Sequence, residues 1–223
     1  MHWKALLIGA ALAMSACTGP AIAAEQVFDA PVATRQANER GLQTAILAGG
    51  CFWGIEAVFS HTRGVTSVIS GYHGGSADDA TYRRVSSGRT GHAESVKITY
   101  DPTVIRYDQL LQILFSVGAD PTLLNNQGPD HGTQYRTAIV PTTAEQRAVA
   151  TSYVRQMSQS GVWDDPIVVQ VEREQRFYPA EAYHQDFADK NPDNAYIKRW
   201  DAPKVEALRE NFPTFYRASF RKG

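Results

Sequence analysis

The sequence predicts an α+β fold with a ferredoxin-like βαββαβ core, to which a peripheral strand, further helices and long C-terminal loops are added. Two observations predict it. Four short apolar runs alternate with two segments of helical periodicity in the order βαββαβ, and glycines or an Asp-Pro pair end most of these elements. The 223 residues, 43% hydrophobic and 20% charged, suffice for one domain to bury a core without disulfides or a metal.

The first strand and helix meet at Cys51. The apolar run 44–48 ends in two glycines, as expected of a buried strand. Apolar side chains then recur at helical spacing: Phe52, Ile55 and Phe59. The chain is therefore expected to pass from strand to helix at Cys51, and a second strand is predicted over 65–72.

The second half of the core repeats this alternation. A strand is predicted over 93–100, before Asp101-Pro102. A helix over 107–117 carries its apolar residues on one face and ends at Gly118, and a fourth strand is predicted over 136–140.

Loops and peripheral elements complete the domain. Two long polar loops, 76–91 and 120–133, are expected to carry function. The capping box from Thr143 to Gln146 begins a helix that ends at Gly161. A peripheral strand is predicted over 167–171, and a last helix around 181–189.

Residues 1–24 have the layout of a secretory signal. Lys4 precedes an apolar stretch, 5–13, that is too short to span a bilayer. Cleavage is expected either after the small-x-small pattern 21–23 or at Cys17, where Met14-Ser15-Ala16-Cys17 resembles a lipobox and the cysteine would carry a lipid anchor. Both place the domain outside the cytoplasm, in a bacterial periplasm, as a soluble or lipid-anchored protein.

The remaining boundaries follow from composition. Residues 25–42 are polar and aperiodic, which indicates a tether. The catalytic domain is expected over 43–216, with a basic tail at 217–223.

Cys51 is the candidate nucleophile. With Cys17 in the leader, it is the one cysteine left for the domain, and exported proteins use cysteines mostly in disulfide pairs. At a helix N-terminus the dipole and unpaired N–H groups lower a thiol pKa, which favours the reactive thiolate. The alternative is an inert, buried structural cysteine.

Glu94 is the candidate proton donor. It shares one strand face with Val96, Ile98 and Tyr100, so its carboxyl is expected to be partly desolvated and its pKa raised. A protonated acid is what reduction of an S=O or O–O bond requires. The alternative is a glutamate at a solvated strand end.

After Cys51, one of Phe52 and Trp53 is expected to form an aromatic wall beside the thiol, although both could instead belong to the core.

The ordered motifs resemble the methionine sulfoxide reductase A family, the peptide-methionine (S)-S-oxide reductases. The residues that carry the resemblance are Gly50-Cys51-Phe52-Trp53-Gly54, Gly91-His92-Ala93-Glu94, Gly132-Thr133-Gln134-Tyr135-Arg136 and Tyr183-His184-Gln185, with shorter matches between them. The resemblance covers residues 44–216. This enzyme class reverses the oxidation of methionine.

The resemblance implies a role for each matching residue. Cys51 attacks the sulfoxide sulfur and Glu94 protonates the oxygen, to which Tyr82 and Tyr135 hydrogen-bond. Phe52 and Trp53 hold the substrate methyl group, Asp130 orders the polar side of the pocket, and Tyr183 and His184 line the rim. The substrate is methionine sulfoxide, free or in oxidised proteins, and the predicted enzyme is a monomer.

The sequence departs from the family where many members carry further cysteines. Ser86 occupies one such position, and no cysteine follows the domain. Because a sulfenic acid on Cys51 then lacks an internal partner, an external thioredoxin-like thiol is the expected reductant.

Other functions find less support. The net charge of −1 gives no positive field for nucleic acid, no histidine or cysteine spacing indicates a metal site, and no motif indicates a bound cofactor. A one-cysteine peroxidase would want a cation beside the thiolate, yet no arginine adjoins Cys51. A module that binds oxidised methionine without turnover remains an alternative, and it predicts binding that survives loss of Cys51.

Overall fold

The computed structural model describes residues 26–223. The leader predicted over 1–24, with Cys17, lies outside the described residues. Within 26–223, no helix has the length and apolar character needed to cross a membrane.

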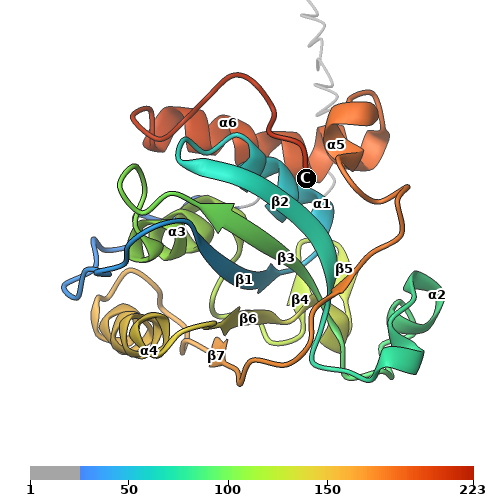
Figure 1. The fold of residues 1–223 in the computed structure, drawn as a ribbon, viewed down its shortest axis with the longest axis horizontal. Helices are drawn as coiled ribbons and strands as arrows, with labels where there is room; N and C mark the ends of the chain where they lie inside the picture. Colours follow the sequence, from blue (N-terminus) through green and yellow to red (C-terminus); the bar gives the residue numbers. More distant parts are fainter. Residues whose placement is uncertain (1–25) are drawn as a thin grey trace, which may run out of the picture.

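The core is a six-stranded sheet in the order β7-β6-β1-β3-β2-β8 (Figure 1). Its four central strands are β6 (Thr137–Val140), β1 (Gln43–Gly49), β3 (Ala93–Tyr100) and β2 (Val65–His73). Each is antiparallel to its neighbour. This order and direction are those of a ferredoxin-like βαββαβ unit, so the predicted fold class is confirmed.

Short strands extend the sheet at both edges. β7 (Gln170–Val171) is parallel to β6, and β8 (Tyr178–Pro179) is antiparallel to β2. A separate hairpin joins β4 (Asn126–Gln127) to β5 (Asp130–His131) inside the second predicted loop. The peripheral strand predicted over 167–171 is thus correct in place but shorter than expected.

Helices α1 (Phe52–Ser60) and α3 (Tyr107–Ile113) pack on one face of the sheet. A π-helical turn, Leu114–Gly118, continues α3 to the glycine where the sequence placed its end. The side chains between helices and sheet form the main core, in which Leu47, Phe59 and Ile98 are fully buried. Residues 172–178 cross the opposite face: Glu172 there pairs with Arg136 at 2.7 Å, and the ring of Phe177 lies under the Lys97 ammonium.

The peripheral helices agree less well with the sequence. α4 (Ala144–Gln159) begins as predicted, with the Thr143 hydroxyl accepting from the Gln146 N–H at 3.1 Å. The helix predicted around 181–189 is wrong: turns occupy 182–186, and α5 spans only Phe187–Lys190. A π-helical turn, Ile197–Asp201, leads into α6 (Ala202–Asn211), a helix that was not predicted from the sequence.

The first predicted loop, 76–91, holds a 3₁₀ turn (Ala77–Asp79) and the short helix α2 (Tyr82–Val85).

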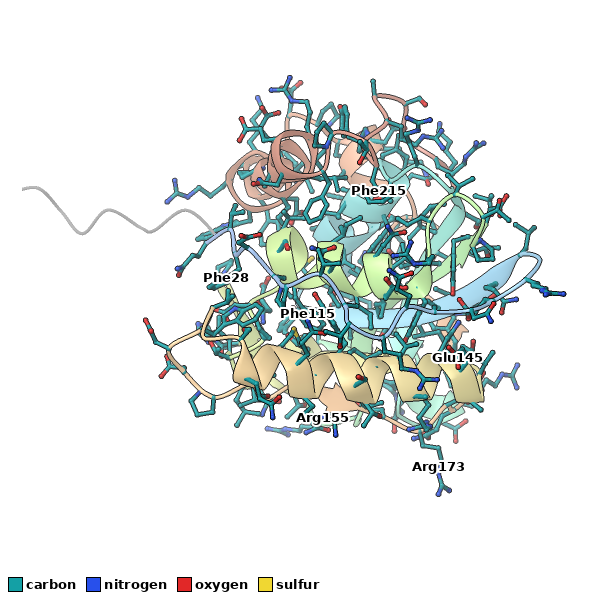
Figure 2. All side chains as sticks on the ribbon, turned by 90° about the vertical axis from the view of Figure 1, so that its left-hand side faces the viewer. Phe28, Phe115, Glu145, Arg155, Arg173 and Phe215 are labelled. Carbon is teal, nitrogen blue, oxygen red and sulfur yellow. The ribbon has the colours of Figure 1, made fainter. Side chains whose placement is uncertain are left out.

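Residues 26–42 were expected to form a tether, but they pack on the domain as a strap without helix or strand (Figure 2). Backbone carbonyls of the strap accept hydrogen bonds from α3 and α4: Gln112 to Ala30, Tyr153 to Pro31 and Gln156 to Val32. Ala30, Ala33 and Ala37 are buried. Small alanines let a polar-looking segment approach two helices closely, which its composition does not reveal.

The end of the strap closes a buried polar network. The Tyr100 hydroxyl donates to Glu39 Oε2 at 2.5 Å and accepts from Gln146 Nε2 at 3.2 Å, while Gln146 also donates to Glu39 Oε1 at 3.1 Å. Tyr100 and Gln146 are fully buried, so their polar atoms depend on this carboxylate.

We expect Glu39→Ala to lower the free energy of unfolding by about 1–3 kcal/mol, because it leaves buried polar groups unsatisfied. Arg35→Ala is the matched control, since it removes only an exposed pair with Glu145, and its effect should stay below about 1 kcal/mol. Denaturant unfolding of both variants measures the difference. Equal effects would show that the strap contributes no more than a surface ion pair.

Candidate active site

Eight side chains line a cavity of about 220 Å³ at the N-terminal end of α1. Seven are the residues expected from the sequence, brought together from five separate segments: Cys51, Phe52, Trp53, Tyr82, Glu94, Asp130 and Tyr135. The eighth, Tyr196, was not predicted. It lies more than 60 residues beyond Asp130 in the sequence, and no local motif marks it.

Cys51 occupies the position just before the first residue of α1 and is half-buried. The chain reaches it through Gly50, whose φ of +87° is open to glycine. A Cβ on Gly50 would meet the Gln127 Cβ at 2.6 Å. Gln127 is held in the second loop by hydrogen bonds to the backbone of Asp120 and the hydroxyl of Thr137. Glycine therefore allows the cysteine to approach the loop that supplies Asp130.

The Cys51 thiol has a pKa well above its ordinary value, which corrects the prediction of a lowered one. Burial is the main cause, followed by the negative potential of Glu94, Asp201 and Asp130. The backbone N–H of Trp53 lowers the thiol pKa, as the helix N-terminus predicts, but this effect is smaller. The resting enzyme therefore holds a protonated thiol.

Glu94 lies opposite the thiol at the start of β3 and is 1% exposed. Its Oε2 accepts a hydrogen bond of 3.1 Å from the Phe52 N–H, the first of α1. The pKa of Glu94 is raised to about 8, mainly by burial; the Phe52 N–H opposes this rise, and Asp130 and Asp201 add to it. The carboxyl is thus neutral at pH 7, as the sequence predicted from the strand face.

Two tyrosines add hydroxyl groups to the cavity. Tyr82 begins α2, and its backbone N–H donates to Glu181 at 2.9 Å. Tyr135 ends the 3₁₀ turn Thr133–Tyr135 just before β6. Burial and the nearby Glu94 raise the pKa of both phenols, that of Tyr82 to about 12. Both remain hydrogen-bond donors over the working pH range.

Aromatic rings form the opposite wall. Phe52 is buried, whereas Trp53 remains half-buried beside the thiol. The Trp53 indole stacks on Phe187 with ring centroids 3.8 Å apart, meets Tyr196 edge-on at 6.0 Å, and donates from Nε1 to His184 Nδ1 at 3.2 Å. Contacts on three sides fix the orientation of the indole.

The C-terminal segments supply groups that the sequence did not indicate. The Tyr196 hydroxyl donates to Asp130 Oδ2, and burial raises the pKa of that aspartate. Asp201, buried at the start of α6, adds negative potential at the thiol. Pro203 and the apolar Val205 and Leu208 are the helix signal that could have located this segment.

The structure places one of the two expected rim residues elsewhere. Tyr183 is 60% exposed, as a rim position requires. His184 is 1% exposed and lies beneath the wall, in ring contact with Phe52, Trp53 and Tyr82. Burial lowers the pKa of His184, so it is a neutral spacer behind the wall rather than a rim group.

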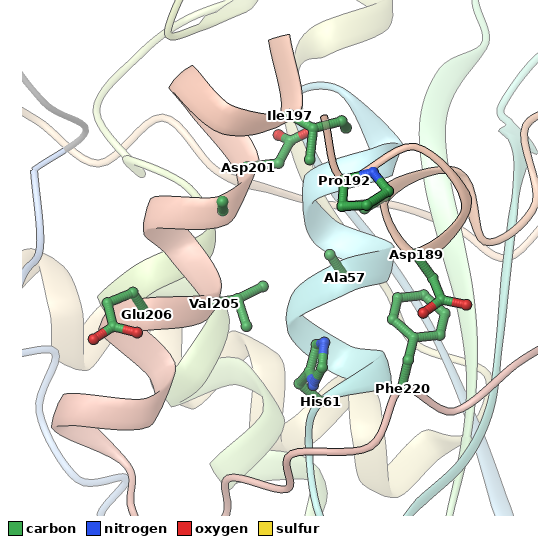
Figure 3. Close-up of a pocket in the computed structure, with 11 residues that line it drawn as sticks. Ala57, His61, Asp189, Pro192, Ile197, Asp201, Val205, Glu206 and Phe220 are labelled. Carbon is green, nitrogen blue, oxygen red and sulfur yellow. The ribbon is translucent and has the colours of Figure 1, made fainter. Parts of the chain in front are cut away.

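A second cavity, of about 390 Å³, lies between α1, α5 and α6 (Figure 3). Ala57 of α1 and His61, the residue after α1, face Val205 of α6 across it, and no cysteine lines it. Within residues 26–223, no group of three or more His, Cys, Asp or Glu side chains is arranged to hold a metal ion.

Comparison with known proteins identifies the family. The family model described as peptide methionine sulfoxide reductase matches residues 43–215. The chain belongs to this family. Among its relatives, the peptide methionine sulfoxide reductase MsrA 2 of Mesorhizobium japonicum is 53% identical over 176 residues, which cover 79% of this chain and 90% of the relative. MsrA 2 of Synechocystis is 49% identical, covering 82% of this chain and 84% of that protein.

Solved structures agree with the fold of this reductase. Reduced Mxr1 from Saccharomyces cerevisiae matches with a TM-score of 0.63 and 31% identity, over 72% of this chain and 92% of that one. Methionine sulfoxide reductase A of Corynebacterium diphtheriae matches with a TM-score of 0.58 and 30% identity, over 77% and 89% of the two chains.

Proposed function

We propose that the enzyme reduces methionine-(S)-sulfoxide, free or in proteins, to methionine, with Cys51 as nucleophile and Glu94 as acid. The observation that carries these roles is the pairing of the lone thiol of the domain with a buried, neutral carboxyl in one aromatic-walled cavity. Family membership supports the reaction, an oxidoreduction that depends on a thiol.

In the proposed reaction, each group has one task. The sulfoxide methyl group packs against Phe52 and Trp53, and the oxygen points toward the hydroxyls of Tyr82 and Tyr135 and the proton of Glu94. Polarisation of the S=O bond makes its sulfur electrophilic, and Cys51 attacks it as its own proton leaves. Glu94 gives its proton to the oxygen and regains one from the thiol, so its neutral state is restored.

The products balance atoms and electrons. The bond that attack forms between the Cys51 sulfur and the substrate sulfur then breaks, together with the sulfoxide S–O bond, as the oxygen passes to the cysteine sulfur. Methionine leaves with its sulfur reduced by two electrons, and Cys51 is oxidised by two electrons to a sulfenic acid that holds the oxygen. An outside thiol then attacks the cysteine sulfur and releases water, and a second thiol resolves the mixed disulfide. A thioredoxin-like dithiol supplies both thiols in one molecule.

Reduction of the Cys51 sulfenic acid by an external thiol is supported by the absence of a second thiol from residues 26–223. Ser86, at the family's alternative cysteine position, ends α2 on the surface, where its hydroxyl donates to the Arg83 carbonyl. Serine cannot form a disulfide, so the sulfenic acid must wait for an incoming thiol.

The charges around Cys51 argue against peroxide reduction. The acidic groups with the largest effect on the Cys51 pKa are Glu94, which acts only where it is ionised, Asp201 and Asp130, and all of them raise it. A peroxide-reducing thiol works as a thiolate and wants a cation beside it. Within residues 26–223, no cation is among the groups that most shift the Cys51 pKa.

The proposal extends to location and assembly. The signal-like pattern of residues 1–24 supports export to the periplasm, with Cys17 as the candidate lipid anchor, and the mass of the N-terminus in the native host tests both. The same proposal includes activity as a monomer.

Incubation of the protein with racemic methionine sulfoxide and a dithiol should consume one epimer, the S form. Cys51→Ser should abolish this turnover and leave the fold intact, because a hydroxyl is a far weaker nucleophile. Chiral chromatography of the remaining sulfoxide is the measurement. Residual activity above about a tenth of wild type would exclude Cys51 as the nucleophile.

Glu94→Gln should slow the reduction step by about 10²- to 10⁴-fold, since an amide keeps the shape but cannot deliver the proton. In the wild type, the donor is present below pH 8 and is lost as the pH rises through its pKa of about 8. Single-turnover rates of methionine formation should fall above that pH in the wild type and stay flat in the variant. An unchanged rate in Glu94→Gln would make the carboxyl structural.

Excess sulfoxide without any thiol should leave the protein heavier by one oxygen, trapped by a sulfenic-selective reagent. Intact mass spectrometry reads this directly. A loss of two hydrogens would instead reveal a disulfide between Cys51 and Cys17. It would overturn the proposal that an external thiol reduces the sulfenic acid.

A further inference from the structure

Glu56 is a buried carboxyl group that the proposed reaction does not use. It lies one turn after Phe52 on α1, outside the catalytic cavity, and its side chain is fully buried. Neither carboxyl oxygen has a partner in full hydrogen-bond geometry. A carboxyl in this condition in the middle of a catalytic helix calls for a physical reason.

The groups that face Glu56 belong to the segment 184–187 and to β2. They are the backbone N–H groups of Asp186 and Phe187 and the hydroxyl of Ser70. Asp186 has a left-handed φ of +55°, which turns the chain back toward α1. Gln185 ties the same segment to β2 by exchanging hydrogen bonds with the Ser70 backbone, at 2.9 Å each way.

This segment also holds the substrate wall. Phe187 stacks on the Trp53 indole, and His184 accepts the indole N–H. Glu56 therefore lies on one side of a short chain segment whose side chains fix Trp53. A change at Glu56 reaches the pocket through the backbone of Asp186 and Phe187.

Among residues 26–223, the charged group with the largest effect on the Glu56 pKa is an acid, Asp186. From the facing segment, Asp186 adds a negative charge, and its carboxylate pairs with Lys190 at 3.2 Å. From β2, the Ser70 hydroxyl faces it. From α6, Asp201 and Lys204 lie against Gly54, two residues earlier on α1. Burial first, and Asp186 in addition, raise the pKa of Glu56 to about 7 against the opposing donors.

We propose that Glu56 is a positioning residue of the substrate pocket: when neutral it lets segment 184–187 close on α1 and hold Phe187 against Trp53, and when ionised it opens that segment. The inference rests on the proposed function. Linkage gives the direction, because a rise in pH favours whichever arrangement holds the proton less tightly. That is the open, hydrated arrangement, since the closed one raises the carboxyl pKa. The closed arrangement of segment 184–187 is fully populated at low pH and is lost as the pH rises through about 7.

The test compares steady-state kinetics of the wild type and Glu56→Gln between pH 6.5 and 8.5, with N-acetyl-methionine sulfoxide amide as substrate. The amide side chain imitates the neutral acid at every pH. KM of the wild type should rise by about threefold or more over this range, and KM of Glu56→Gln by less than about 1.5-fold. At each pH, kcat should agree within about twofold, because bound substrate selects the closed form.

Two further variants make the comparison specific. Glu206→Gln, an exposed change of the same charge on α6, should follow the wild type. Glu56→Asp keeps the ionisable group but is shorter by one methylene, so its KM should be raised at every pH. The proposal is overturned if Glu56→Gln keeps the wild-type pH dependence of KM, if its effect is confined to kcat, or if Glu56→Asp behaves as wild type.

An optical titration provides a reading without turnover. The near-UV circular dichroism of the Trp53–Phe187 stack should change through pH 7 in the wild type, and should stay constant in Glu56→Gln and in Trp53→Phe. A constant wild-type signal would overturn the role of Glu56. If the wild type turned over no sulfoxide, the proposed function would fail, while this titration would still decide the question of Glu56.

Discussion

The hydrogen bond from the Phe52 N–H to the Glu94 carboxyl joins the two halves of the active site. It connects the first residue of α1 to the second residue of β3. Both positions follow from the sheet: β1 and β3 are antiparallel, so the end of β1 that leads to Cys51 lies beside the start of β3. The bond satisfies a helix N–H that has no partner within its own helix. It also fixes the acid beside the nucleophile without a charge on either group, since the N–H opposes but does not overcome burial.

Removal of water governs the remaining chemistry. The thiol, the carboxyl and both phenols have raised pKa values, and burial is the largest cause in each case. These four groups therefore keep their protons and carry no charge at neutral pH. A polar, neutral sulfoxide can enter such a site without bringing an ion into it, and its own oxygen then receives the stored proton. The three carboxyl groups near the thiol, which would harm a permanent thiolate, are compatible with a thiolate that exists only during attack.

Much of the fold could be predicted from local sequence, because each core strand and helix has its own apolar periodicity and most of them end at glycines. Cys51 and Glu94 were predicted from their places at the ends of these elements, whereas Tyr82, Tyr135 and Asp130 were predicted from the family resemblance, because spacing alone indicated only loop residues. The failures are long-range. Tyr196 and Asp201 arrive from a C-terminal helix that the sequence analysis missed, and His184 is drawn under the wall by three aromatic neighbours. The thiol pKa was misjudged for the same reason: the helix terminus is a local effect, whereas burial and the opposing carboxylates come from the assembled fold.

The strap has a mechanical consequence. It lies against α3 and α4 and leads directly into β1, which Gly50 connects to Cys51. The strap and the nucleophile are thus separated by the seven residues of that strand, which span roughly 23 Å, and by Gly50. A pull on the N-terminus, such as a membrane attachment would transmit, loads the bonds of Tyr153 and Gln156 to the strap before it reaches the sheet. The hydrogen bonds of the strap therefore lie between the N-terminal end of the described chain and the catalytic geometry at Cys51.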